Sequence, residues 1–181
     1  MSEYTEAHIV QGCLSGDQRS QRALYERYKV QMFRLCLRYA HNRMEAEDML
    51  QEGFVKVYTD LHQFKQTGPL GGWIRRVMVN TALQFIRKRK KLFPMLDIEL
   101  AEAQYALEEE RGATLNPHLL TKMIQRLPAG YRAVFNMHVL EGYTHREIAE
   151  YMGIEPNTSK SQLSKAKAML RKLLSKQLKL R

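Results

Sequence analysis

The chain has 181 residues and a formal net charge of +10, from 29 Lys and Arg against 19 Asp and Glu. Such a basic balance favours an anionic partner such as nucleic acid. No apolar run approaches membrane-spanning length and no signal peptide precedes the first expected helix, so we expect a cytoplasmic protein. Cys13, Cys36 and six scattered histidines form no metal or catalytic motif, so we expect no metal, cofactor or small-molecule substrate.

Apolar residues recur with a helical period from Gln18 to Phe64, without the alternation of a strand, which predicts an all-α fold. Within this stretch the segment 45–64 has two opposite faces. Its apolar face comprises Ala46, Leu50, Phe54, Val57 and Leu61. Its other face carries Asp48, Gln51, Glu52 and Thr59, with Val55 among them. An apolar side chain inside an acidic, amide-bearing stripe is typical of a protein-binding surface, although a solvated face with one stray valine fits the same pattern.

The glycines and the proline of the segment 62–72 predict an irregular loop, and we expect the next helix to begin at Trp73. This helix carries basic and amide side chains, namely Arg75, Arg76, Asn80, Gln84, Arg87 and Lys88. With Phe64 and Trp73 beside it, the helix has the residues to hold unstacked bases, because an aromatic face stacks on any base and amides read the base edge. A core position for Trp73 is the alternative interpretation.

The sign of the charge reverses near the middle of the chain. The basic run from Arg87 to Lys91 is followed between Phe93 and Gly112 by six acidic residues and a single arginine. Because Pro94 and Pro117 bound this stretch, it is interpreted as a flexible acidic linker. The sequence therefore predicts two small helical domains, 1–92 and 116–181, joined by the linker 93–115.

The segment from Gly142 to Leu173 predicts two helices joined by a tight turn. Thr144 and Glu147 have the spacing of a capping box at the start of the first helix. Gly153 favours the end of that helix and Pro156 the start of the next. From Thr158 onward there are eight basic residues and no acidic one. This combination indicates a DNA-reading helix-turn-helix, with an ordinary basic surface helix as the alternative.

Taken together, these segments resemble a bacterial sigma factor of the extracytoplasmic-function (ECF) type, which carries two domains called sigma-2 and sigma-4. The first domain is similar to two family motifs, D-[LM]-x-Q-E-x-F at Asp48 to Phe54 and W-[LI]-x-x-[IV]-[AM]-x-N-x-[AC]-x-[DN]-x-x-R at Trp73 to Arg87. The second domain follows the family order of Leu-Pro, Glu-Gly, I-A-x-x-[ML]-G-[IC] and T-x-K-S-x-L-x-[RK]-A. The resemblance covers nearly the whole chain.

Three positions depart from the family pattern. Gln84 stands where the family often has an acid, and Ser159 replaces a small apolar residue in the recognition helix. Gln162 stands where arginine is common. Since an amide pairs best with adenine and arginine with guanine, the change at Gln162 bears on which base is read.

The resemblance implies three sets of site residues. The polymerase-binding set is Asp48, Gln51, Glu52 and Val55. The set for the minus-ten promoter element, which the protein melts, is Phe64, Lys65, Trp73, Arg76, Asn80, Gln84, Arg87 and Lys88. The set for the minus-thirty-five element is Thr158, Lys160, Ser161, Gln162, Ser164 and Lys165.

The resemblance also implies a function without catalysis. Such a protein binds core RNA polymerase, directs it to specific promoter DNA, and is commonly held inactive by an anti-sigma factor. A stand-alone DNA-binding regulator is the main alternative, but it leaves the surface around Asp48 and the helix from Trp73 unexplained. A nucleic-acid enzyme is disfavoured because no catalytic group is recognised.

Overall fold

The computed structural model describes residues 5–92 and 117–179, and these residues form helices and turns with no strand. The all-α prediction is therefore confirmed. In chain order the elements are α1 (Glu6–Leu14), α2 (Gln18–Tyr39), α3 (Arg43–Asp60), the 3-10 turn η1 (Leu61–Gln63), α4 (Leu70–Leu92), α6 (Pro117–Gln125), α7 (Ala129–Phe135), the π-helical turn η2 (Asn136–Leu140), α8 (His145–Met152) and α9 (Pro156–Lys179). The predicted linker, 93–115, lies outside the described residues.

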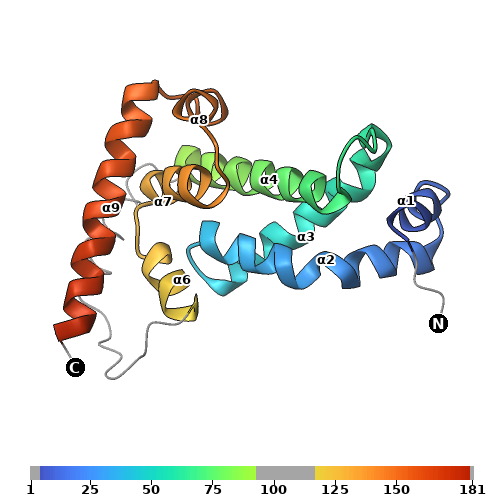
Figure 1. The fold of residues 1–181 in the computed structure, drawn as a ribbon, viewed down its shortest axis with the longest axis horizontal. Coiled ribbons are helices and arrows are strands. Elements are labelled where there is room, and N and C mark those ends of the chain that lie inside the picture. The colour runs from blue at the N-terminus through green and yellow to red at the C-terminus, as the bar shows by residue number, and fades with distance from the viewer. Residues whose placement is uncertain (1–4, 93–116, 180–181) are drawn as a thin grey trace.

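In the amino-terminal unit, α1 to α4, three long helices lie side by side, with α1 packed across one end (Figure 1). Side-chain caps start two of them: Asp17 accepts from the backbone N–H of Ser20 at 2.9 Å, and Asn42 accepts from that of Glu45 at 2.8 Å. Such caps satisfy backbone donors that have no partner within the helix. The core between the helices includes Leu24, Met32, Leu35, Phe54, Val57, Ile74 and Met78.

The start of α4 differs from the prediction. The helix begins at Leu70, three residues before Trp73, so Gly71 and Gly72 lie in its first turn. Leu70 is fully buried, and a Cβ added at Gly71 would lie 3.0 Å from the Tyr28 ring. The glycine therefore allows α4 to approach α2 closely. The sequence analysis interpreted these glycines as part of a loop, whereas Gly71 serves a close contact between two helices.

In the carboxy-terminal unit, α6 to α9, the predicted helix-turn-helix is present as α8 and α9. The capping box is formed, with the Thr144 N–H donating to the Glu147 carboxylate at 2.8 Å. Gly153 ends α8 in the left-handed region at φ 64°, and α9 begins at Pro156. Leu163 and Ala166 face the core of this unit.

The two units pack against each other. Figure 1 shows α6, α7 and α8 beside the ends of α2 and α4, with α9 crossing on the outside. One apolar cluster runs through the contact and includes Leu35 and Tyr39 of the first unit and Val134 and Met137 of the second. Among the described residues, no helix is both long and apolar enough to span a membrane.

Candidate functional site

The outer face of α3 carries the four predicted polymerase-binding residues. Asp48, Gln51, Glu52 and Val55 are all exposed, on the side opposite the buried face of the helix. Val55 is 63 % exposed. Lys56 flanks the stripe and its ammonium lies 3.6 Å from the Glu52 carboxylate. The face is therefore acidic and amide-bearing, with one accessible apolar side chain near its centre.

Phe64 and Trp73 lie together at the start of α4. Their ring centroids are 5.7 Å apart, and both side chains are half-buried against the core. Trp73 therefore packs partly against the core, and part of the residue remains accessible. Lys65 is exposed in the preceding loop, next to Gln66, whose φ is +54°.

The basic and amide residues predicted on α4 form one stripe, because Arg76, Asn80, Gln84 and Lys88 follow one another at intervals of four. Asn80 is half-buried, while Arg76, Gln84, Arg87 and Lys88 are exposed. The Gln84 side-chain oxygen accepts a hydrogen bond from Lys56 of α3. This contact joins the α4 stripe to the edge of the α3 face.

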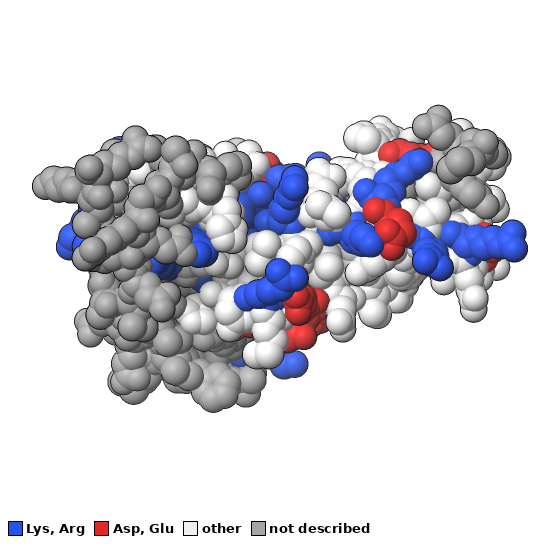
Figure 2. All heavy atoms as spheres, turned by 90° about the horizontal axis from the view of Figure 1, so that it is seen from below, with Lys and Arg blue, Asp and Glu red and all other residues white. Residues whose placement is uncertain are grey.

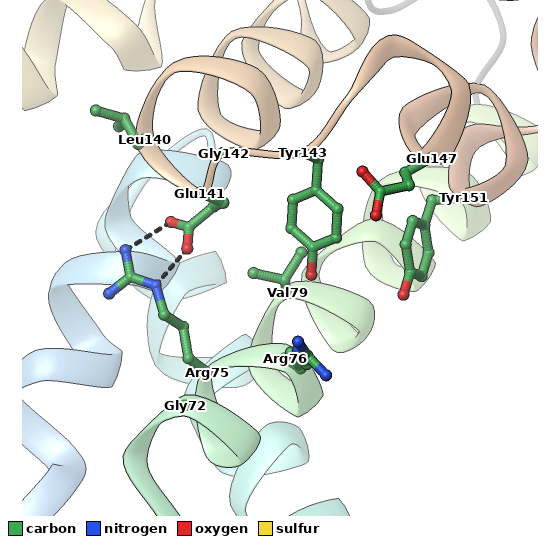
Figure 3. A pocket seen from close by; sticks show the side chains of 10 residues that line it. All are labelled: Gly72, Arg75, Arg76, Val79, Leu140, Glu141, Gly142, Tyr143, Glu147 and Tyr151. Atoms are coloured by element: carbon green, nitrogen blue, oxygen red, sulfur yellow. Dashed lines mark hydrogen bonds and ion pairs between the residues drawn. The ribbon is translucent and has the colours of Figure 1, made fainter. Parts of the chain in front are cut away.

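A groove of about 480 Å³ lies between α4 and the carboxy-terminal unit, beside their contact (Figure 3). Arg75, Arg76 and Val79 line it from α4, while Glu141, Tyr143, Glu147 and Tyr151 line it from the other side. The rings of Tyr143 and Tyr151 meet edge to face with centroids 5.4 Å apart. The hydrogen bonds that Glu147 accepts from Thr144 lower the pKa of its carboxyl. Because Arg75 and Arg76 lie on the opposite wall, the groove presents charges of both signs.

The predicted recognition helix, α9, presents most of its candidate residues outward. Thr158, Lys160, Ser161, Ser164 and Lys165 are exposed. Gln162 is half-buried and faces α7, where its Oε1 would lie 3.5 Å from a Cβ at Gly130. In this arrangement the base-reading interpretation of Gln162 requires its side chain to rotate away from α7.

Sequence reasoning missed how Ser159 is held. Its side chain is fully buried, and its Oγ lies 2.9 Å from Nδ1 of His145 at the start of α8. The buried hydroxyl therefore has a partner, and the departure from a small apolar residue is accommodated. A spacing of fourteen residues carries no periodic signal, so the sequence could not reveal this pair.

Charge is not concentrated on the face that carries α2. Figure 2 shows Lys and Arg side chains there interspersed with Asp and Glu. The net positive charge of the chain therefore forms no continuous basic patch over the described part of this face. Among the described residues, no group of three His, Cys, Asp or Glu side chains is placed to hold a metal ion.

Comparisons with known proteins match both units of the chain. The family described as "Sigma-70 region 2" matches residues 24–92, and that described as "Sigma-70, region 4" matches residues 118–170. These ranges contain every predicted site residue. The first matches the α3 and α4 surfaces and the second the helix-turn-helix.

Curated relatives match along nearly their whole length. RNA polymerase sigma-H factor of Pseudomonas aeruginosa is 25 % identical, with 96 % of each chain covered. The ECF RNA polymerase sigma factor SigW of Bacillus subtilis is 29 % identical, with 88 % of this chain and 91 % of the relative covered. The ECF RNA polymerase sigma-E factor of Haemophilus influenzae is 25 % identical, with 93 % of this chain and 94 % of the relative covered.

Two solved structures share the fold. The sigma factor RpoE, in complex with the anti-sigma factor NepR from Bartonella quintana, aligns with a TM-score of 0.52 at 19 % identity and covers 85 % of this chain and 98 % of its own. CnrH, in complex with the cytosolic domain of CnrY, aligns with a TM-score of 0.50 at 20 % identity. The alignment covers 92 % of this chain and 95 % of CnrH.

Proposed function

Because the chain belongs to the sigma-70 family of RNA polymerase sigma factors, and to its ECF type, we propose that it binds core RNA polymerase and directs transcription initiation at specific promoters. One observation carries this proposal: a single chain presents an acidic–apolar face on α3, a stripe of basic and amide side chains on α4 and an exposed basic helix, α9. A protein that only binds duplex DNA has no use for the first two surfaces. The protein acts by binding, without catalysis of its own, and we place it in the cytoplasm with the polymerase.

In this proposal the α3 face binds the clamp helices of the polymerase's largest subunit. Val55 supplies the apolar anchor, while Asp48 and Glu52 meet cationic partners around it. Central apolar anchors carry most of the binding energy of an interface, and charged rims mainly set specificity and association rate. Gln51 adds a hydrogen-bonding amide to the same stripe.

The α4 stripe and the Phe64–Trp73 pair receive the minus-ten element. Melting a duplex costs stacking and pairing energy, and holding an unpaired base against an aromatic ring offsets part of that cost. Asn80 and Gln84 offer amides to base edges, while Lys65, Arg76, Arg87 and Lys88 neutralise phosphates.

The exposed side of α9 enters the major groove at the minus-thirty-five element. Thr158, Lys160, Ser161, Ser164 and Lys165 are placed for phosphate and base contacts, and Gln162 joins them if it turns outward. A further expected partner is an anti-sigma factor, since a solved structure of the same fold contains one. Such an inhibitor would cover the surfaces that polymerase and promoter use.

The deciding experiment is in vitro transcription with purified core polymerase on a promoter library, with and without this protein. Starts that appear only with the protein support the proposal, and aligning them gives both promoter elements. A variant carrying Asp48→Lys and Glu52→Lys is the control and should yield no starts while retaining helicity. If wild type gives no starts yet binds duplex DNA tightly by itself, the stand-alone regulator is the better interpretation.

A further inference from the structure

The side chain of Gln162, on α9, rests against α7 instead of pointing into solvent. It is half-buried, and its carboxamide lies over Gly130, where an added Cβ would be 3.5 Å from Oε1 and 3.6 Å from Nε2. We call this contact between the Gln162 carboxamide and Gly130 the seat. Both distances are ordinary van der Waals contacts, so an alanine at position 130 would still leave room for the amide.

The seat leaves the amide incompletely hydrogen-bonded. Within the described part of the chain, Oε1 of Gln162 is buried and has no hydrogen-bond partner. A buried acceptor without a donor costs free energy, which is recovered when the atom reaches water or a new donor. Packing against α7 therefore holds the side chain in the seat, while the unpaired oxygen favours its release.

The seat lies at the edge of the outward face of α9. Thr158, four residues before Gln162, and Lys165, three residues after it, are exposed on the same side of the helix. A Gln162 side chain that leaves α7 therefore turns towards residues proposed to meet the minus-thirty-five element. Adenine is the base that suits it, because adenine N6 can donate to Oε1 while N7 accepts from Nε2.

We propose that Gly130 is a specificity-determining residue that acts through Gln162. It provides a weakly satisfied seat, from which the Gln162 amide moves to read an adenine in the minus-thirty-five element. The base preference at that position then depends on a residue of α7 as well as on α9. The seat rests only on the contacts above, whereas its use in reading DNA rests on the proposed function.

Three variants separate the seat from the packing around it. Gly130→Ser places a hydroxyl one bond beyond a Cβ that is 3.5 Å from Oε1, so it can donate the missing hydrogen bond and retain the amide. Gly130→Ala adds the same Cβ without a donor and is the matched control. Gly130 lies within α7 and is not among the glycines with positive φ, so both replacements suit the helix. Gln162→Ala removes the reading amide.

The reading role is tested on duplexes that the full-length wild-type protein selects from randomised DNA, with each base pair then replaced in turn. Wild type should prefer adenine by about tenfold at one position, and Gln162→Ala should lose this preference. Gly130→Ser should reduce it by about fivefold, because a neutral hydrogen bond now retains the amide, whereas Gly130→Ala should keep it. Equal adenine preference in the two Gly130 variants would overturn the role of Gly130. A preference that survives Gln162→Ala would overturn the reading role.

The seat has its own readout, which needs neither DNA nor polymerase. In two-dimensional NMR of the free protein, the side-chain amide signal of Gln162, assigned by its loss in Gln162→Ala, should lie apart from that of an exposed glutamine such as Gln31. Coincident signals would overturn the seat. If the seat is seen but wild type neither selects a duplex sequence nor directs transcription, the proposed function fails and the reading role with it. If wild type directs transcription but the Gly130 variants behave alike, only this inference fails.

Discussion

His138 and His145 stack nearly face to face, with ring centroids 4.4 Å apart and ring planes 12° apart. Nδ1 of His138 donates to the Tyr143 carbonyl at 2.9 Å, and Nδ1 of His145 lies 2.9 Å from the Ser159 hydroxyl. The pair therefore joins η2, α8 and α9. The pKa of His145 is lowered, chiefly by desolvation and then by the positive charge of His138, Lys160 and Lys167.

This stack predicts a loss of stability in acid. In the unfolded chain His145 returns to a pKa near 6.5, so below that pH the unfolded state binds a proton that the folded state resists. The free energy of unfolding should therefore fall as pH drops through 6.5 towards the folded pKa, and the contribution is absent at higher pH. Urea denaturation at about pH 7.5 and about pH 5.5 should show that the free energy of unfolding falls less for His145→Gln than for wild type. His118→Gln, at an exposed position, should behave as wild type.

The exposed valine of α3 gives a second prediction. Val55→Asp should weaken binding to core polymerase by about tenfold or more, because it places a charge at the proposed apolar anchor. Since Val55 is 63 % exposed, helicity and thermal midpoint should stay unchanged. Val30→Asp, at a position on α2 that is 55 % exposed, is the matched control and should bind normally. Equal polymerase affinity for the two variants would place the binding surface elsewhere.

The two outward lysines of α9 predict a change in salt dependence. Lys160→Ala and Lys165→Ala should each lower promoter affinity and reduce the slope of log affinity against log salt by about one, because each phosphate contact releases condensed counterions. Binding is measured by fluorescence anisotropy at several salt concentrations on minus-thirty-five duplex. Lys29→Ala, on α2, should leave the slope as it is. A slope insensitive to the α9 changes would remove this helix from the DNA.

The turn between α8 and α9 predicts a backbone effect on stability. Gly153 has φ 64°, and a Cβ built there has nothing within 4 Å, so the cost of substitution is conformational alone. Gly153→Ala should lower the free energy of unfolding by about 1–2 kcal/mol, while Gly153→Asn should cost less, because asparagine tolerates the left-handed region. Chemical denaturation of both variants checks this. An alanine as stable as the asparagine would mean that the turn can change conformation.

Local features of the helix-turn-helix were predictable because they depend on residues close in sequence. The capping box of Thr144 and Glu147 and the end of α8 at Gly153 follow from short-range rules, and the structure shows them. Gly71 shows where these rules fail. Its lack of a side chain serves contact with Tyr28, a neighbour far away in the chain, so a loop was predicted where α4 begins.

By itself the sequence determined the all-α class, the faces of α3, α4 and α9, and the resemblance to ECF sigma factors, since helical period, charge and motif order are written along the chain. Only the tertiary structure decided that Arg38 and Arg75 enclose Glu141, that Gln125 and Asn136 cap α2, and that Arg76 faces a groove while α9 stays open. The physical reason is the large separation of the partners along the chain. These partners lie 66 to 103 residues apart, and neither periodicity nor spacing specifies which buried carboxylate meets which arginine.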